Sequence, residues 1–156
     1  MNNIDLIVYD FDGVMTDNKA YVDQKGNETV QVNRGDGLGV SEIKKLGKEQ
    51  IIISTETNPV VMKRAEKLGI SCMQGIENKK VALIDYCKNN NFDLQNVAYV
   101  GNDINDKQVM EIAGTTYCPS DAHKSIQSIS DNILKTKGGD GVIREILDLM
   151  NNKKGE

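Results

Sequence analysis

The sequence lacks the residues that mark several common classes of protein. It has no tryptophan, one histidine (His123) and three cysteines, Cys72, Cys87 and Cys118, scattered over 156 residues without CxxC spacing. One histidine and three separated cysteines offer no His-Cys metal cluster. The cysteines are typical of core or free thiols in a reducing compartment.

Long apolar runs and an excess of basic residues are also missing. No apolar stretch approaches the length that crosses a membrane, and the first apolar run has neither a charged segment before it nor a small-residue cleavage site after it. The 19 basic and 23 acidic residues give a net charge of −4. Nucleic-acid-binding modules are usually basic, so that class is disfavoured, and we expect a cytoplasmic protein.

The chain is organised around an apolar run, Ile4 to Tyr9, that ends in two aspartates, Asp10 and Asp12. The run is too short for a typical helix and predicts a strand buried on both faces, as in a parallel sheet. Residues two apart on an extended segment point the same way, and ligands bind at the carboxyl ends of such strands. By itself the pair fits either a ligand or cation site or a solvated turn.

Strand and helix patterns alternate along the rest of the chain, with no internal repeat. This alternation predicts one α/β domain over residues 1–150, a doubly wound parallel sheet of Rossmann-like form, with a frayed tail at 151–156. Turn residues between two β-prone segments predict a projecting hairpin at about 19–33. Apolar positions place Val81, Ile84 and Cys87 on the inner face of a helix over 78–88. Further strands are expected at 50–56, 71–74, 97–100, 116–118 and 132–134.

Polar side chains follow four of the predicted strands: the Asp10 pair, Ser54, Lys79, and an acidic loop with Asp103 and Asp106. Carboxylate oxygens suit Mg²⁺, and a lysine with a hydroxyl group suits phosphate oxygens. The combination indicates metal-assisted phosphoryl transfer. Ser54 could instead cap its loop, and the neighbouring Lys80 could be the functional lysine in place of Lys79.

These residues resemble, in order, the four motifs of the haloacid dehalogenase-like phosphatase superfamily. The first motif, DxDx[TV], is matched by residues 10–14, and the others by Ser54, Lys79 and the acidic loop. The resemblance implies that Asp10 is the nucleophile, forming an aspartyl-phosphate, and that Asp12 is the acid and base.

The same resemblance implies a Mg²⁺ site and its supports. An Asp10 oxygen, the Asp12 backbone carbonyl and Asp103 would hold the metal, while Asp106 would hold metal-bound water or Lys79. Ser54 and Lys79 would neutralise the phosphoryl oxygens. Asn102 stands where many relatives have another aspartate.

The spacing of the motifs leaves no room for a cap domain. Within the superfamily the chain is similar to small tetrameric phosphatases of 3-deoxy-octulosonate 8-phosphate and their relatives in nonulosonic acid pathways. The residues that carry this resemblance are 32–37, 74–75, 120–123 and 138–145. It implies that the hairpins build a homotetramer and that a neighbouring subunit completes each active site.

One departure concerns the substrate. The octulosonate phosphatases have a Gly-Arg pair after the second-motif hydroxyl, whereas this chain has Thr55-Glu56, which exchanges a cation for an anion. We therefore favour 2-keto-3-deoxynononate 9-phosphate as the substrate over 3-deoxy-D-manno-octulosonate 8-phosphate. Lys67 could supply a positive charge or be a solvated helix lysine, and Arg64 and Arg144 are candidates for the substrate carboxylate.

Two alternatives belong to other classes. A noncatalytic tetramerisation domain would share the fold, but it would not need the complete set of Asp10, Asp12, Ser54, Lys79 and Asp103. A phosphoacceptor signalling receiver also has an aspartate at the end of a strand, but it does not explain Asp12 or the glycine-rich loop near the C-terminus. We therefore expect an enzyme, a phosphatase that uses Mg²⁺.

Overall fold

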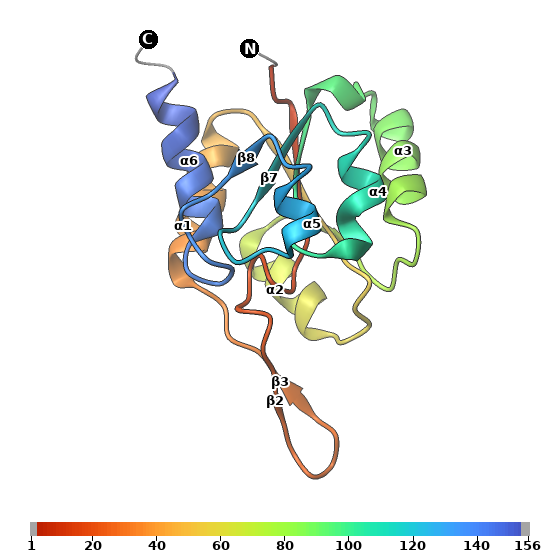
Figure 1. The fold of residues 1–156 in the computed structure, drawn as a ribbon, viewed down its shortest axis with the longest axis vertical. Coiled ribbons are helices and arrows are strands. Elements are labelled where there is room, and N and C mark those ends of the chain that lie inside the picture. The colour runs from red at the N-terminus through yellow and green to blue at the C-terminus, as the bar shows by residue number, and fades with distance from the viewer. Residues whose placement is uncertain (1–2, 154–156) are drawn as a thin grey trace.

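Six parallel strands form the centre of the molecule. The computed structural model describes residues 3–153, and Figure 1 shows the helices packed around the sheet. The strand order β5-β4-β1-β6-β7-β8 reverses direction between β1 and β6, which opens a crevice at the carboxyl ends of these two strands. The strands are β1 (Leu6–Tyr9), β4 (Glu49–Ile53), β5 (Ser71–Met73), β6 (Val97–Val100), β7 (Thr115–Cys118) and β8 (Asn132–Ile133).

Helices cover both faces of the sheet, which confirms the predicted fold class. Apolar side chains of β1 point alternately to the two faces of the sheet, so both faces need a layer of helices. Ile7 and Tyr9 belong to one hydrophobic cluster, and Leu6 and Val8 belong to the other. Helices α1 (Arg34–Lys45), α2 (Val60–Leu68) and α6 (Val142–Asn152) pack on the first cluster. Helices α3 (Lys79–Asn90), α4 (Lys107–Met110) and α5 (Lys124–Gln127) pack on the second. Among the described residues, no helix is both long and apolar enough to cross a membrane.

A hairpin projects from the sheet, as predicted. Strands β2 (Tyr21–Val22) and β3 (Glu28–Thr29) pair in antiparallel fashion and extend away from the body of the molecule at the bottom of Figure 1. An antiparallel bridge between Thr16 and Val32 closes the base of the hairpin. Within residues 3–153, no cap domain is inserted between the predicted motifs.

The inner face predicted for α3 is partly wrong. Val81 and Ile84 are 50% and 38% exposed, whereas Lys79, Leu83 and Cys87 face inward. Apolar residues lie all round this helix, so their spacing did not fix its rotation. The rotation that buries Lys79 also buries Leu83, four residues later on the same face.

The predicted ends of one strand and of the last helix also differ from the structure. Strand β4 ends at Ile53, three residues before the end of the predicted strand at 56. Helix α6 continues to Asn152, so it includes the first two residues of the expected tail. Residues 154–156 of that tail lie outside the described part of the chain.

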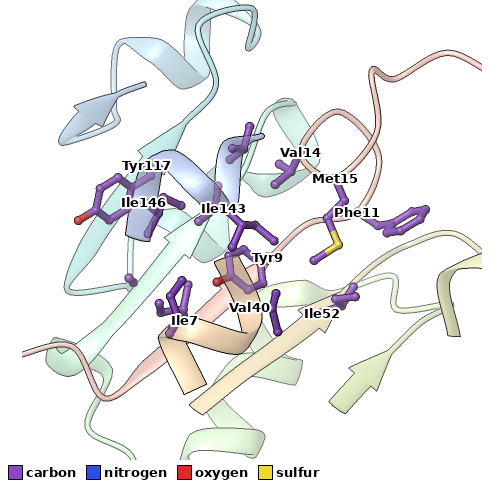
Figure 2. Close-up of a cluster of buried hydrophobic side chains, with 14 of the residues drawn as sticks. Ile7, Tyr9, Phe11, Val14, Met15, Val40, Ile52, Tyr117, Ile143 and Ile146 are labelled. Carbon is purple, nitrogen blue, oxygen red and sulfur yellow. The ribbon is translucent and has the colours of Figure 1, made fainter. Parts of the chain in front are cut away.

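Helix α6 is attached to α1 through a buried carboxylate. Asp36, in the first turn of α1, accepts a hydrogen bond from the backbone N–H of Ile143 at the start of α6. Gly39 allows the two helices to approach closely, because a Cβ atom there would lie 3.1 Å from Ile143 Cγ2. Figure 2 shows Ile143 beside Tyr9 in the cluster under this contact. Burial raises the pKa of Asp36 to about 6, although the N–H groups of Ile143 and Arg144 oppose the shift.

This carboxylate should make stability depend on pH. Between the ordinary pKa of 3.8 and about 6, folded Asp36 keeps a proton that the unfolded chain has released, so stability falls as pH rises through this window. We expect Asp36→Asn to lose this dependence, and its unfolding free energy relative to wild type should rise by about 3 kcal/mol between pH 4 and 7. Urea unfolding at a series of pH values measures the difference. The matched control is Asp148→Asn on the exposed side of α6, and equal pH slopes for wild type and Asp36→Asn would contradict the assignment.

Candidate active site

The ends of β1 and β6 bring the predicted acidic residues together. The two strands pair in register, Tyr9 with Val100, and the Asp10 N–H donates a hydrogen bond to the Val100 carbonyl over 3.0 Å. The loops that follow both strands therefore enclose a cavity of about 90 Å³. Its lining is almost entirely polar and consists of Asp10, Asp12, Asn18, Ser54, Thr55, Asn102, Asp103 and Asn105.

Lys79 lies between two buried carboxylates. Its Nζ atom is 2.9 Å from Asp10 Oδ1 and 2.9 Å from Asp106 Oδ1, and all three side chains are buried. Asn78 starts α3 by accepting the N–H of Val81, and this start directs Lys79 inward from the first turn. Of the two adjacent lysines, Lys79 is thus the one that faces Asp10.

Asp106 supports this lysine from a loop that it also shapes. Its Oδ2 atom accepts the N–H groups of Asn102 and Asp103, and its Oδ1 atom accepts the hydroxyl of Tyr99 over 2.8 Å. Sequence reasoning missed Tyr99. The available signal was a tyrosine within an otherwise apolar strand, since a buried tyrosine hydroxyl usually needs a partner.

The charges at this strand end are not balanced by the protein alone. Burial and the Asp106 carboxylate raise the pKa of Asp10 to about 7, and Lys79 opposes the shift. Burial lowers the pKa of Lys79, but Asp10 and Asp106 raise it further, so the lysine stays charged. One cation therefore serves two buried carboxylates, and a second positive charge nearby would favour the ionised form of Asp10.

The residues present fit a hard divalent cation. Asn102 Oδ1 is buried without a hydrogen-bond partner, and Asn102 lines the cavity with Asp10 and Asp103. Within residues 3–153, no three His, Cys, Asp or Glu side chains converge as metal ligands. The predicted set does not require three, because it has two carboxylates and the backbone carbonyl of Asp12. Oxygen ligands supplemented by water are typical of Mg²⁺.

Asp12 lies where the small cavity meets a second one. The second cavity, of about 170 Å³, is lined by Asp12, Asn18, Lys19, Ala20, Glu28, Val30, Glu56, Asn58 and Val60. Burial raises the pKa of Asp12, as do Glu56 and Glu28, whereas a hydrogen bond from Thr16 lowers it. A raised pKa suits a group that must hold a proton before it donates one.

The end of β4 contributes Ser54, Thr55 and Glu56. Ser54 is buried and, with Thr55, lines the small cavity, while Glu56 lines the second one. The Glu56 carboxylate accepts the N–H groups of Thr57 and Asn58 at 2.9 and 3.0 Å. These bonds fix the anion at the start of the loop that leads to α2.

The other three predicted substrate-binding residues lie outside the two cavities that Asp12 lines. Arg64 donates a hydrogen bond to the Asn33 carbonyl, and Arg144 lines a different cavity between α1 and α6. Lys67 is exposed on α2. Neither of the two cavities that Asp12 lines includes these three residues. Their positions within one chain give no support to the predicted substrate contacts.

Comparison with known proteins identifies the family. The family of haloacid dehalogenase-like hydrolases matches residues 41–146, which is most of the chain. The chain belongs to this family. The matched range includes Ser54, Lys79 and Asp103, whereas Asp10 and Asp12 precede it.

Individual relatives identify the group within this family. The chain is 35% identical over 149 residues to the 3-deoxy-D-manno-octulosonate 8-phosphate phosphatase of Escherichia coli K12, covering 95% of this chain and 79% of the relative. The corresponding phosphatase of Moraxella catarrhalis, solved with magnesium, phosphate and KDO, is 30% identical with a TM-score of 0.91, covering 97% and 90%. A HAD family hydrolase from Streptomyces avermitilis is 42% identical with a TM-score of 0.90, covering 92% and 83%. The hydrolase is thus a capless phosphatase of this group, a phosphoric monoester hydrolase.

Proposed function

We propose that this hydrolase removes phosphate from a 2-keto-3-deoxy sugar acid, with Asp10 as the nucleophile and Mg²⁺ as the metal. The observation that carries the proposal is the buried Asp10–Lys79–Asp106 arrangement beside a small polar cavity. A nucleophilic carboxylate splits one difficult hydrolysis into two easier steps. The names of the relatives support a sugar-acid phosphate as the substrate and magnesium as the cation.

In the proposed mechanism an Asp10 oxygen attacks phosphorus while the bond to the ester oxygen breaks. Asp12 gives its proton to that oxygen, so the sugar acid leaves as an alcohol. Asp12 then takes a proton from water, whose oxygen attacks phosphorus and releases phosphate and the Asp10 carboxylate. Lys79 and Ser54 hold the phosphoryl oxygens. Mg²⁺, held by Asp10, the Asp12 carbonyl and Asp103, would supply positive charge for the phosphoryl group.

Within this substrate class we propose the nine-carbon 2-keto-3-deoxynononate 9-phosphate. Glu56 supports this choice, because it places a fixed anion in the cavity beside Asp12. An anion is a good acceptor for the hydroxyl groups of a sugar chain and repels a carboxylate. The eight-carbon 3-deoxy-D-manno-octulosonate 8-phosphate is the alternative, and the names of the relatives support it.

A paired assay tests the substrate. We expect Mg²⁺-dependent phosphate release, abolished by chelation with EDTA, with a higher kcat/KM for the nine-carbon ester than for the eight-carbon ester. Glu56→Arg should reverse that preference by about tenfold or more, because it replaces the anion with a cation. Glu56→Gln is the matched control, since it keeps the acceptor for Thr57 and Asn58 and removes only the charge. A constant preference in all three proteins would contradict the role of Glu56, and no turnover of either ester would favour a noncatalytic domain.

We further propose that the protein works as a cytoplasmic homotetramer in which a neighbouring subunit completes each site. The hairpin supports assembly, because Tyr21 and Val22 are 82% and 64% exposed on it. Free Cys72, Cys87 and Cys118 support a reducing compartment. Light scattering at several protein concentrations tests the assembly, and a monomer with full activity would contradict it.

A further inference from the structure

We propose that Thr16 is a positioning residue that holds the Asp12 carboxyl group in the orientation from which it protonates the leaving group. The proposal rests on the proposed function, because it concerns the first step at the same site, in which the leaving group departs. Thr16 lines neither cavity that Asp12 lines. It acts through Asp12 alone.

The hydrogen bonds of the Thr16 hydroxyl leave it one direction in which to donate. Its Oγ1 atom accepts the backbone N–H groups of Gly13 at 3.2 Å and Asn18 at 3.1 Å. A hydroxyl group has one proton and two acceptor positions, so both acceptor positions are filled. The proton therefore points to the third neighbour, Asp12 Oδ1, at 3.1 Å. The direction of this bond is set by the backbone and does not depend on a free rotation.

The backbone of Thr16 is itself held on three sides. Its N–H donates to the Phe11 carbonyl, and its bridge to Val32 ties it to the base of the hairpin. On the third side, Gly138 and Gly139 pack against residues 13–17, where a side chain on either glycine would collide with the backbone. Thr16 is completely buried by these contacts. A hydroxyl group fixed in this way can in turn fix one oxygen of Asp12.

Orientation matters for Asp12 because the group lies at the opening between the two cavities. It is partly exposed, and its charged neighbours in the second cavity are Lys19, Glu28 and Glu56. With Oδ1 held by Thr16, the other oxygen is left to carry the proton to the ester oxygen. Without the hydroxyl group, the carboxyl group can rotate, and the proton is less often directed at the leaving group.

The choice of leaving group separates this role from a structural one. The alkoxide of the sugar acid is a poor leaving group unless it is protonated as it departs. In contrast, p-nitrophenolate is a good leaving group without a proton. Water attack on phosphorylated Asp10 uses Asp12 with both esters, so the two esters differ only in the phosphorylation step, which kcat/KM reports. A defect in the general acid therefore lowers kcat/KM for the sugar-acid ester and spares kcat/KM for p-nitrophenyl phosphate. A general loosening of the loop slows both, because Asp10 attacks both esters.

The experiment compares Thr16→Val, Thr16→Ala and Thr16→Ser on p-nitrophenyl phosphate and on the eight- or nine-carbon ester that wild type hydrolyses faster. We expect Thr16→Val and Thr16→Ala to lower kcat/KM for the sugar-acid ester by about 30-fold, and for p-nitrophenyl phosphate by less than about threefold. Thr16→Ser keeps the hydroxyl group and should stay within about threefold of wild type on both.

Both rates are measured on the same preparation, so their ratio does not depend on the folded fraction. If Thr16→Val does not fold, the Ser and Ala variants decide the question between them. Thr115→Val is the matched control. Thr115 lies at the amino end of β7, away from the carboxyl ends of the strands that form the site, so this variant should leave the ratio of the two rates unchanged. Equal losses on both esters, or no difference between Ser and Ala, would overturn the role of Thr16. Wild-type protein that hydrolyses neither ester would instead overturn the proposed function.

Discussion

Replacing Asp10 with asparagine is expected to lower kcat by a factor of about 10⁴ or more with any phosphate ester. Asparagine has nearly the same shape, but its amide oxygen does not form the acyl phosphate that the mechanism requires. The fold should survive, because Lys79 keeps its second partner, Asp106. Steady-state phosphate release measures the loss, and urea unfolding checks the fold.

A neighbouring carboxylate provides the control for this variant. Asp17 lies on the same loop, accepts the N–H of Lys19 and lines neither cavity that contains Asp12. Asp17→Asn should keep most of the activity, since asparagine keeps the accepting oxygen. Asp10→Asn protein with more than about one-hundredth of wild-type activity would show that another group is the nucleophile.

The second large effect is expected for Lys79→Met, on both stability and activity. Methionine fills the space of the lysine stem but leaves Asp10 and Asp106 buried without a cation. Removing one partner from a buried ion pair typically lowers stability by about 3–5 kcal/mol. We expect kcat to fall by about 10²-fold or more as well, because the proposed mechanism uses Lys79 to hold the phosphoryl oxygens.

The pH dependence of the stability of Lys79→Met shows whether the unpaired Asp10 carboxylate causes the loss of stability. Without Lys79, the pKa of Asp10 should rise further, and a protonated Asp10 needs no cation. Folded Asp10 then holds a proton that the unfolded chain releases, so stability is lost as pH rises, and the destabilisation should be larger at pH 8 than at pH 5. The double variant Lys79→Met/Asp10→Asn should recover part of the loss. Lys80→Met is the matched control, and an equal loss there would contradict the assignment of Lys79.

Local patterns were enough to predict the parts of the site that depend on strand ends. Asp10, Ser54 and Asp103 each follow an apolar run, and parallel strands bring such positions to one edge. Lys79 was predicted because it enters a helix after the predicted strand at 71–74 and matches the lysine motif of the superfamily. The fold class followed from the same alternation of strands and helices, and the structure confirms it.

Contacts between distant segments could not be predicted in this way. The position of Thr16 depends on the hairpin base and on the loop at Gly138, which meet only in the folded chain. The rotation of α3 was misjudged because Val81 and Ile84 are apolar yet exposed, on a helix with apolar residues all round. The sequence also did not show where the side chains of Arg64, Lys67 and Arg144 point. Such long side chains can reach several partners from one backbone position.

Trapping the phosphorylated protein tests most directly whether phosphate passes through Asp10. In Asp12→Asn, p-nitrophenyl phosphate should still phosphorylate Asp10, since its leaving group needs no proton, whereas water attack should be slow. With Mg²⁺, we expect a burst of about one p-nitrophenolate per subunit before slow turnover. Borohydride reduction of the quenched protein should then convert residue 10 to homoserine, as found by peptide mass spectrometry. Turnover with no burst, or a phosphorylated residue other than Asp10, would contradict the account.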